Sequence, residues 1–420
     1  MTEKIVLKYG GTSVGSGERL VHVAKVVKNI KETTTPIVVL SAMSGTKKSE
    51  GTTSRLLEAV QEILKPQSQR YLHIVDMIEN SHLEAAIFAL GNSENKQILE
   101  DLENDIRGEC QKLRSFMAAA EIIDEISPKS KDVIVSMGEK LSARLFTAVL
   151  NDQGVAAKYI NLDKLITKQF DASELDQSFY DYLSLRLAEE IVPYMNTHVC
   201  VVTGFFGPCP GSLLNTVGRG YTDLTAALIA VGIQAAELQI WKEVDGIFTA
   251  DPRKVPRAKK LRYISPEEAA ELTYYGSEVI HPFTMEQVIR ACIPIRIKNT
   301  FNPDGSGTLI IPEGHPMTPT TSSASLSNAF SRHPTAVTIK DHVIVLNVHS
   351  NRRSVSHGFL AQTFLILDQF NIVVDLISTS EVHVSMAIGK IESEEKLQKA
   401  IENIKKFATV IIINLGRFTA

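Results

Sequence analysis

The stretch Val199–Pro252 constrains the fold of this 420-residue chain more than any other. It begins with an apolar run, Val201–Phe206, passes through a loop rich in glycine and proline, and continues as a helix that starts near Thr222 or Asp223. A second apolar run ends at Trp241. Short apolar runs separated by helices are typical of parallel strands buried on both faces, so the stretch predicts an α/β fold.

The loop of this stretch carries a candidate anion-binding site. Gly218-Arg219-Gly220 stands directly before Thr222 and Asp223, either of which suits the N-cap of the helix. A flexible backbone, a guanidinium group and a helix N-terminus are together suited to binding a carboxylate or a phosphate. Glycines that only turn the chain would leave the same pattern, so the residues by themselves leave both interpretations open.

A second glycine loop lies near the N-terminus. The strand Ile5–Leu7 leads to Lys8 and then to the turn Gly10-Gly11-Thr12-Ser13, which a helical pattern follows. Backbone N–H groups in a strand–turn–helix arrangement can bind phosphate. The lysine precedes the glycines, so this is not a Walker A loop, and a solvated lysine at a strand end is the alternative interpretation.

Further strands and helices continue the β/α order. The strand Pro36–Leu40 ends in a loop of small hydroxyl residues, Ser41–Thr46, and residues 52–126 are largely helical. Asp132–Val135 leads into a helix start at Ser136–Ala143, which contains Glu139. From the residues alone we expect Glu139 to cap the first turn of that helix, the alternative being contact with a ligand ammonium group.

The C-terminal region changes character. Residues 312–334 are rich in Pro, Ser and Thr and have little periodicity, which predicts a linker between a domain at 1–311 and a domain at 335–420. The second domain has the element order β-α-β-β-α-β, which is ferredoxin-like. We therefore expect a mainly parallel sheet in an αβα sandwich, followed by a smaller α+β domain.

Composition excludes several classes of protein. The charged fraction is 22%, the formal net charge is −4, and no long block of Lys and Arg occurs, so we expect no nucleic-acid surface. No apolar run approaches the roughly 20 residues of a membrane span. The 4 cysteines lack metal-site or disulfide spacing. We expect a cytoplasmic protein with no membrane partner.

Six segments together resemble the aspartate kinases (aspartokinases) of the amino-acid kinase superfamily. In chain order they are Lys8–Val14 (KYGGTSV), Val38–Thr46 (VVLSAMSGT), Ser136–Ala143 (SMGEKLSA), Val217–Leu228 (VGRGYTDLTAAL), Trp241–Leu261 and Tyr274–Met285. His357–Phe364 and Val373–Ile388 resemble the first ACT domain of the regulatory region. The sequences of these motifs are most similar to those of monofunctional enzymes of the fungal type.

The resemblance implies ATP-dependent phosphorylation of the β-carboxylate of L-aspartate to 4-phospho-L-aspartate, the first step toward threonine, methionine and, in many organisms, lysine. A catalytically impaired homologue that binds effectors is the alternative. The implied catalytic residues are Lys8, Arg219 and Asp223. The implied substrate-binding residues are Ser41, Thr46, Glu139, Arg219, Thr222 and Asp223. The residues implied for ATP are Lys8, Gly10, Gly11, Thr12, Ser13, Lys242, Glu243, Phe248 and Arg253.

The resemblance also implies cofactor and regulation. Mg²⁺ would accompany ATP, held chiefly by phosphates and water, with no protein ligand assigned. A threonine or lysine effector is expected around His357, Gly358, Phe359, Leu360, Asp375, Ser380 and Glu381. Family members continue into a second ACT domain, so we expect this domain to be truncated here, with weakened threonine inhibition. We also expect a homo-oligomer formed through the ACT domains.

Overall fold

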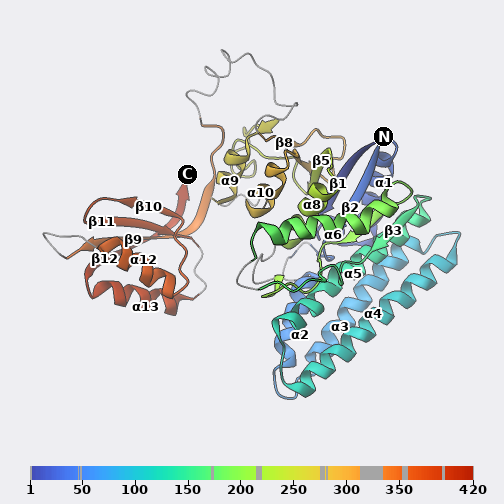
Figure 1. Cartoon of the computed structure of the whole chain (residues 1–420), viewed down its shortest axis with the longest axis horizontal. Coiled ribbons are helices and arrows are strands. Elements are labelled where there is room, and N and C mark those ends of the chain that lie inside the picture. Colours follow the sequence, from blue (N-terminus) through green and yellow to red (C-terminus); the bar gives the residue numbers. More distant parts are fainter. Residues whose placement is uncertain are drawn as a thin grey trace, which may run out of the picture. The chain divides into compact units, whose positions relative to one another are not determined.

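The structure is a computed structural model. It describes residues 2–45, 47, 50–171, 175–213, 220–274, 280, 282–312, 334–351, 358–389 and 393–419 (Figure 1). None of the helices in these ranges has the length and apolar character needed to cross a membrane. The chain divides into two compact units, the first made of Met1–Ile247, Lys260–Ala269 and Ile280–Leu326, the second of Phe248–Lys259, Ala270–Val279 and Ser327–Ala420.

The first unit contains an eight-stranded sheet in the order β3-β4-β2-β1-β5-β7-β8-β6. All neighbouring strands are parallel except the antiparallel pair β7–β8. The strands are β1 (Glu3–Tyr9), β2 (Thr34–Leu40), β3 (Ala157–Ile160), β4 (Val199–Thr203), β5 (Glu237–Lys242), β6 (Tyr263–Ile264), β7 (Ile295–Asn299) and β8 (Thr308–Ile310). The predicted, mainly parallel sheet is thus confirmed, and β1 lies near its centre.

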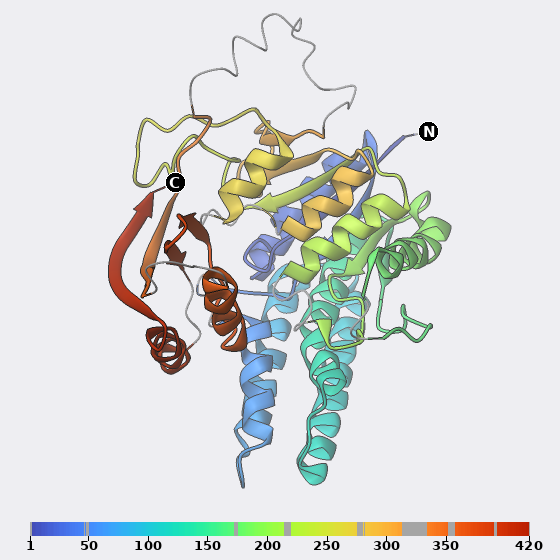
Figure 2. The same ribbon diagram turned by 60° about the vertical axis from the view of Figure 1, so that its left-hand side comes forward.

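Helices cover both faces of this sheet (Figure 2). On one face α1 and α5 pack against the strands, and α2, α3 and α4 pack beyond them; on the other face α6 and α8 contact the strands, and α10 contacts α8. The bounds are α1 (Gly17–Lys31), α2 (Thr52–Ile63), α3 (Arg70–Leu90), α4 (Lys96–Ile123), α5 (Pro128–Asp152), α6 (Gln177–Met195), α8 (Tyr221–Gly232), α9 (Pro266–Tyr274) and α10 (Pro282–Arg290). This is the predicted αβα sandwich.

Alternation along β1 decides which side chains reach which helix layer. Ile5, Leu7 and Tyr9 belong to the apolar core formed with α1 and α5. Because successive side chains of a strand point to opposite faces, Lys8 faces the layer that contains α8. Lys8, at the carboxyl end of this strand, therefore faces the start of α8.

One predicted N-cap and one predicted helix start were wrong. α8 begins at Tyr221 with Gly220 at its N-cap, so Thr222 and Asp223 lie inside the first turn. α5 begins at Pro128, eight residues before Ser136, because Ser127 caps the helix: its Oγ accepts a hydrogen bond from the Ser130 N–H at 3.1 Å. Proline at the first helical position fits this start, since its missing N–H would have no helical partner there.

The second unit contains an antiparallel sheet in the order β10-β11-β9-β12, with a core shared with two helices. Its elements follow the chain as β9 (Ile339–Ser350), α12 (Phe359–Gln369), β10 (Leu376–Thr379), β11 (His383–Ile388), α13 (Glu394–Lys405) and β12 (Ala408–Thr419) (Figure 1). This is the predicted ferredoxin-like order. The third element, β10, starts at Leu376, inside the segment Val373–Ile388 that resembles an ACT domain.

Candidate active site

The carboxyl ends of four parallel strands meet at one edge of the large sheet. Tyr9 at the end of β1 is in register with Leu40 on β2 and with Trp241 on β5, and Leu40 is in register with Thr203 on β4. The loops that follow these strands therefore begin side by side. Ligands of open α/β sheets bind outside the carboxyl ends of the strands, so we expect the ligand site at this edge.

An ion pair joins β1 to α8 at this edge. Lys8 Nζ lies 2.8 Å from Asp223 Oδ1, and the two side chains are 11% and 15% exposed. Asp223 lies in the first turn of α8, where the positive end of the helix dipole favours a carboxylate. The structure thus brings together two of the three predicted catalytic residues. The third, Arg219, lies outside the described residues, as does Thr46.

The glycine loop after β1 packs tightly against the loop after β2. The N–H of Ser44 donates to the carbonyl oxygen of Gly11 at 3.0 Å. A Cβ atom on Gly11 would lie 2.3 Å from the carbonyl oxygen of Ala42, whereas one on Gly10 would meet only Lys8 Nζ, at 3.9 Å. Gly11 is therefore required for the close approach of the two loops, and Gly10 leaves open space beside the lysine.

The predicted phosphate-loop hydroxyl residues differ in their surroundings. Ser13 is fully buried, and its Oγ lies 2.9 Å from Thr300 Oγ1 and 3.3 Å from Glu243 Oε1. The carbonyl oxygen of Thr12 accepts a hydrogen bond from Arg19 Nη1 at 2.6 Å. These contacts fix the loop to α1 and to the segments after β5 and β7, which holds its backbone in place.

Glu139 lies in the interior of α5, so the expectation that it caps a first turn was wrong. Its side chain is buried, and Oε1 accepts a hydrogen bond from Tyr221 Oη at 2.7 Å. Burial raises the pKa of Glu139 to about 7, against the opposing effect of hydrogen bonds from Tyr221 and from the backbone of Glu139 and Ala42. Oε2 has no hydrogen-bond partner among the residues that the structure describes. Such a carboxylate is suited to receiving a cationic group.

Ser41 and Thr222 lie beside these groups. The carbonyl oxygen of Ser41 accepts from Ser142 Oγ at 2.8 Å, and Ser142 lies one turn after Glu139 on α5. Thr222 is buried against Gly204, where an added Cβ would lie 2.5 Å from Thr222 Cγ2 and from the Leu40 carbonyl oxygen. Gly204 thus lets the first turn of α8 approach the ends of β2 and β4.

The predicted nucleotide residues fall into both units. In the first unit Lys242 ends β5, and its carbonyl oxygen accepts from the Thr300 N–H at 2.8 Å. Glu243 follows it and contacts Ser13 as described above. Phe248 and Arg253 belong to the second unit, where Arg253 is exposed and paired with Asp251. The role of all four residues toward ATP stays a prediction.

Comparison with known proteins identifies the family. The profile of the amino acid kinase family matches residues 3–299. The aspartokinase of Schizosaccharomyces pombe is 46% identical over 422 residues, covering 98% of this chain and 80% of that protein. The aspartokinase of Saccharomyces cerevisiae is 47% identical, covering 97% of this chain and 80% of that protein. The chain belongs to the aspartokinases. The comparisons give no support to the alternative of a catalytically impaired homologue.

Two solved aspartokinase structures have the same architecture. Escherichia coli aspartokinase III in complex with lysine and aspartate has a TM-score of 0.76 and 28% identity, covering 98% of this chain and 85% of that one. The same enzyme in complex with aspartate and ADP has a TM-score of 0.72 and 28% identity, covering 98% and 86%. The predicted amino-acid kinase fold is thereby confirmed.

Sequence reasoning did not single out two buried residues that hold neighbouring groups in place, Asp132 and Tyr221. Asp132 on α5 accepts hydrogen bonds from Ser212 Oγ at 2.6 Å and from the Leu213 N–H at 3.0 Å, which anchors the loop after β4. Tyr221 holds Glu139, as described above. A tyrosine between the glycine loop and Asp223 was a usable signal for a polar contact, but the sequence does not reveal its partner, Glu139, 82 positions earlier.

The predicted effector residues of the aspartokinase regulatory region lie in the second unit, except His357, which is outside the described residues. Gly358 is the N-cap of α12 with a φ of 80°, Phe359 lies in the apolar core, and Leu360 packs against that core. Asp375 pairs with Lys340 at 2.7 Å. Ser380 and Glu381 lie in the turn between β10 and β11, where the Ser380 N–H donates to the His383 carbonyl oxygen at 2.8 Å. Effector binding by these residues stays a prediction.

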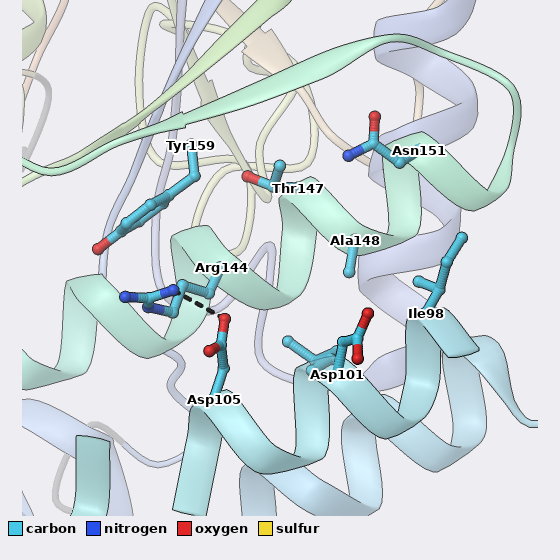
Figure 3. A pocket seen from close by; sticks show the side chains of 9 residues that line it. Ile98, Asp101, Asp105, Arg144, Thr147, Ala148, Asn151 and Tyr159 are labelled. Carbon is cyan, nitrogen blue, oxygen red and sulfur yellow. Dashed lines mark hydrogen bonds and ion pairs between the residues drawn. The ribbon is translucent and has the colours of Figure 1, made fainter. Parts of the chain in front are cut away.

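A cavity of about 240 Å³ lies between α4, α5 and β3 (Figure 3). Arg144 forms one wall, pairing with Asp105 Oδ2 at 2.8 Å and lying under the ring of Tyr159, 4.7 Å from its centroid. None of the predicted site residues lines this cavity. Within the described ranges, no group of three or more His, Cys, Asp or Glu side chains is arranged to hold a metal ion.

Proposed function

We propose that this aspartokinase transfers the γ-phosphoryl group of ATP to the β-carboxylate of L-aspartate at the edge formed by β1, β2 and β4, and that Lys8, Glu139 and Asp223 are the central residues. The observation that carries the proposal is the first turn of α8. There Tyr221 holds the buried Glu139 and Asp223 holds Lys8, so one turn connects a group suited to an ammonium ion with a group suited to a phosphoryl oxygen.

The chemistry requires little from the protein beyond positioning and positive charge. The acceptor carboxylate is already ionised near neutral pH, so no general base is needed. The obstacle is the approach of two anions, which a lysine and backbone N–H groups offset by stabilising the charge that spreads over the transferring phosphoryl oxygens. Lys8 with the Gly10–Gly11 loop supplies both kinds of donor at the carboxyl end of β1.

Glu139 would bind the aspartate ammonium group through Oε2 and so discriminate for an amino acid. Arg219, Ser41, Thr46 and Thr222 are proposed to bind the remaining polar groups of aspartate, with Arg219 gripping a carboxylate bidentately. Lys242, Glu243, Phe248 and Arg253 are proposed for the nucleotide. Mg²⁺ would accompany ATP, held chiefly by phosphates and water, and would supply further positive charge.

The regulatory assignments are also proposals. We propose a catalytic domain at 1–311, a linker at 312–334 and an ACT domain at 335–420 that binds threonine or lysine and joins subunits. The support is the ferredoxin-like order of the second unit and the lysine held by the E. coli relative in one solved structure. The cytoplasmic location remains a prediction.

ADP release measured with ATP and Mg²⁺ tests the proposed function. Aspartate should support ADP release, whereas glutamate, one methylene longer, should support it at least tenfold less well, a typical penalty for one methylene in a fitted pocket. Equal rates with both, or a preference for glutamate, would assign the chain to another acceptor. No release with either amino acid would contradict the proposal altogether.

A further inference from the structure

We propose that Tyr221 is a positioning residue for the substrate-binding carboxylate: its hydroxyl fixes one oxygen of Glu139 and leaves the other free for the ammonium group of aspartate. This inference rests on the proposed function and assigns a role to a residue that enters neither the phosphoryl-transfer chemistry nor the substrate contacts described above.

The geometry gives Glu139 two unlike oxygens. Oε1 accepts from Tyr221 Oη at 2.7 Å, whereas Oε2 has no hydrogen-bond partner among the described residues. Both side chains are buried, at 1% and 4% exposure of the residues. A buried carboxylate oxygen without a partner carries a desolvation penalty that an incoming ammonium group would remove. The hydroxyl thereby selects which oxygen is left for the ligand.

The hydroxyl also influences how much of Glu139 is ionised before the substrate arrives. Burial raises the pKa of Glu139 to about 7, and the hydrogen bond from Tyr221 acts in the opposite direction. Burial and the charge of Glu139 raise the pKa of Tyr221 well above its usual value of 10.0, so the phenol remains a donor at working pH. Without this donor, Glu139 should be protonated over a wider pH range and bind a cation less well.

Among the described residues, the charged groups on the neighbouring elements have partners other than Glu139. Asp132, on the same helix as Glu139, acts on Tyr221 but is committed to the loop after β4. On α8, Asp223 is paired with Lys8 from β1, and on α5, Lys140 is paired with Asp163. On the α2 side, Tyr221 has a hydrogen bond with the uncharged Thr53. Among the described residues, Tyr221 is thus the side chain whose hydrogen bond favours the ionised form of Glu139.

The position of Tyr221 also links the two halves of the site. It is the first residue of α8, and its ring packs edge-on against Phe205, with centroids 5.2 Å apart. Removing only the hydroxyl should preserve this packing and leave the helix start in place. The Tyr221→Phe variant therefore isolates the hydrogen bond.

The test compares kcat/KM for aspartate in the wild type and in Tyr221→Phe between pH 6 and pH 8.5. At pH 6 the variant should be about tenfold less efficient, because a shift of one pKa unit changes the ionised fraction tenfold below the pKa. At pH 8.5, where Glu139 is mostly ionised in both proteins, the difference should shrink to within about threefold. The KM for ATP should not change.

A matched control is Tyr71→Phe. Tyr71 is also buried, and its Oη also donates to a glutamate, Glu121 Oε2 at 2.6 Å, but this pair joins α3 to α4 away from the sheet edge. The control should keep the wild-type pH profile. Thermal unfolding of both variants verifies that they are folded.

The outcomes separate this inference from the proposed function. If the wild type phosphorylates aspartate but Tyr221→Phe has the wild-type profile, or loses the same factor at every pH, the positioning role is wrong and the proposed function stands. If the wild type itself does not phosphorylate aspartate, the proposed function fails and takes the inference with it.

Discussion

Lys8 Nζ lies 2.8 Å from Asp223 Oδ1, which connects the end of the central strand β1 to the first turn of α8. The strand presents the lysine to the α8 layer because its neighbours Leu7 and Tyr9 occupy the opposite core. Gly204 allows the helix to come close enough for the pair to form, since a side chain there would collide with Thr222. The ion pair thus depends on features from three separate segments.

We predict that Lys8→Met lowers kcat for aspartate phosphorylation by roughly 10²–10³-fold, the loss seen when one preorganised charge-stabilising donor is removed. Steady-state rates of ADP release measure this loss of kcat. Lys4→Met is the control, because Lys4 lies on the same strand but donates to the Ile233 carbonyl oxygen at 2.9 Å. Near-wild-type activity of Lys8→Met would contradict the assigned role.

Lys8→Met also leaves Asp223 without its lysine partner, so a loss of stability must be separated from a loss of catalysis. Melting temperatures of Lys8→Met and of the wild type separate the two effects: at an assay temperature well below both, the kcat of Lys8→Met should stay low. A kcat that recovers at such a temperature would mean that Lys8 acts only through the fold.

We predict that Glu139→Gln makes the protein more stable and less active. The pKa of Glu139 is raised from 4.5 to about 7, so the folded state binds more protons than the unfolded state between these values, and stability falls as pH rises through that window. At pH 8 the ionised carboxylate should cost ~3 kcal/mol, which the amide avoids. Melting temperatures at pH 8 and pH 4.5 measure the difference, which should be largest at pH 8.

The same variant should bind aspartate at least tenfold more weakly, because the amide replaces a charge-assisted hydrogen bond. Aspartate should therefore raise the melting temperature of the wild type more than that of Glu139→Gln at equal concentration. An equal shift in both proteins would show that Glu139 does not contact the substrate.

We predict an acid-sensitive contribution to stability from His82. This side chain is fully buried in α3, and desolvation lowers its pKa from 6.5 to about 4. Because the unfolded state takes up the proton first, stability should fall as pH drops from 6.5 toward 4, by ~3 kcal/mol in all. Denaturant unfolding of the wild type and of His82→Gln measures this, and the variant should have the flatter pH dependence.

The control for His82 is His73→Gln, an exposed histidine on the same helix. It should unfold with the wild-type pH dependence. If the free energy of unfolding of His82→Gln falls with pH as steeply as that of the wild type, another group causes the acid sensitivity.

We predict that Gly11→Ala disrupts the loop after β1. The new Cβ would lie 2.3 Å from the Ala42 carbonyl oxygen, so the loops must separate, at a cost of ~1–3 kcal/mol and with a strong loss of activity. Gly108→Ala is the control: it is exposed in the interior of α4 with open space around it, and should stabilise by roughly 0.5–1 kcal/mol. Full activity of Gly11→Ala would show that the close approach is dispensable.

Much of the fold could be predicted because its strands are short apolar runs. Pro36–Leu40 and the run ending at Trp241 correspond to β2 and β5, which the structure extends by one or two residues. The start of α5 was missed because the pattern before Ser136 was not recognised as helical, although Ser127-Pro128 is a good N-terminal signal. The predicted boundary was therefore wrong where a helix cap, and not hydrophobic periodicity, sets the start of the helix.

The sequence allowed some of the candidate site residues to be predicted, but not the contacts that depend on tertiary packing. Lys8 and Asp223 could be singled out because each adjoins a glycine loop at an element boundary. The Glu139–Tyr221 hydrogen bond could not, since it depends on how α5 and α8 pack across the sheet edge. Sequence reasoning from the residues alone placed Glu139 at a helix start, whereas tertiary packing buries it in the middle of α5.

The most direct test of the central claim is to trap the product. An acyl phosphate formed on the β-carboxylate of aspartate reacts with hydroxylamine to give a hydroxamate, which can be identified by mass. Wild-type protein with ATP, Mg²⁺ and aspartate should produce β-aspartyl hydroxamate in step with ADP. Lys4→Met should do the same, and Lys8→Met should produce it roughly 10²–10³-fold more slowly. ADP released without the hydroxamate, or hydroxamate formed equally by Lys8→Met, would contradict the account.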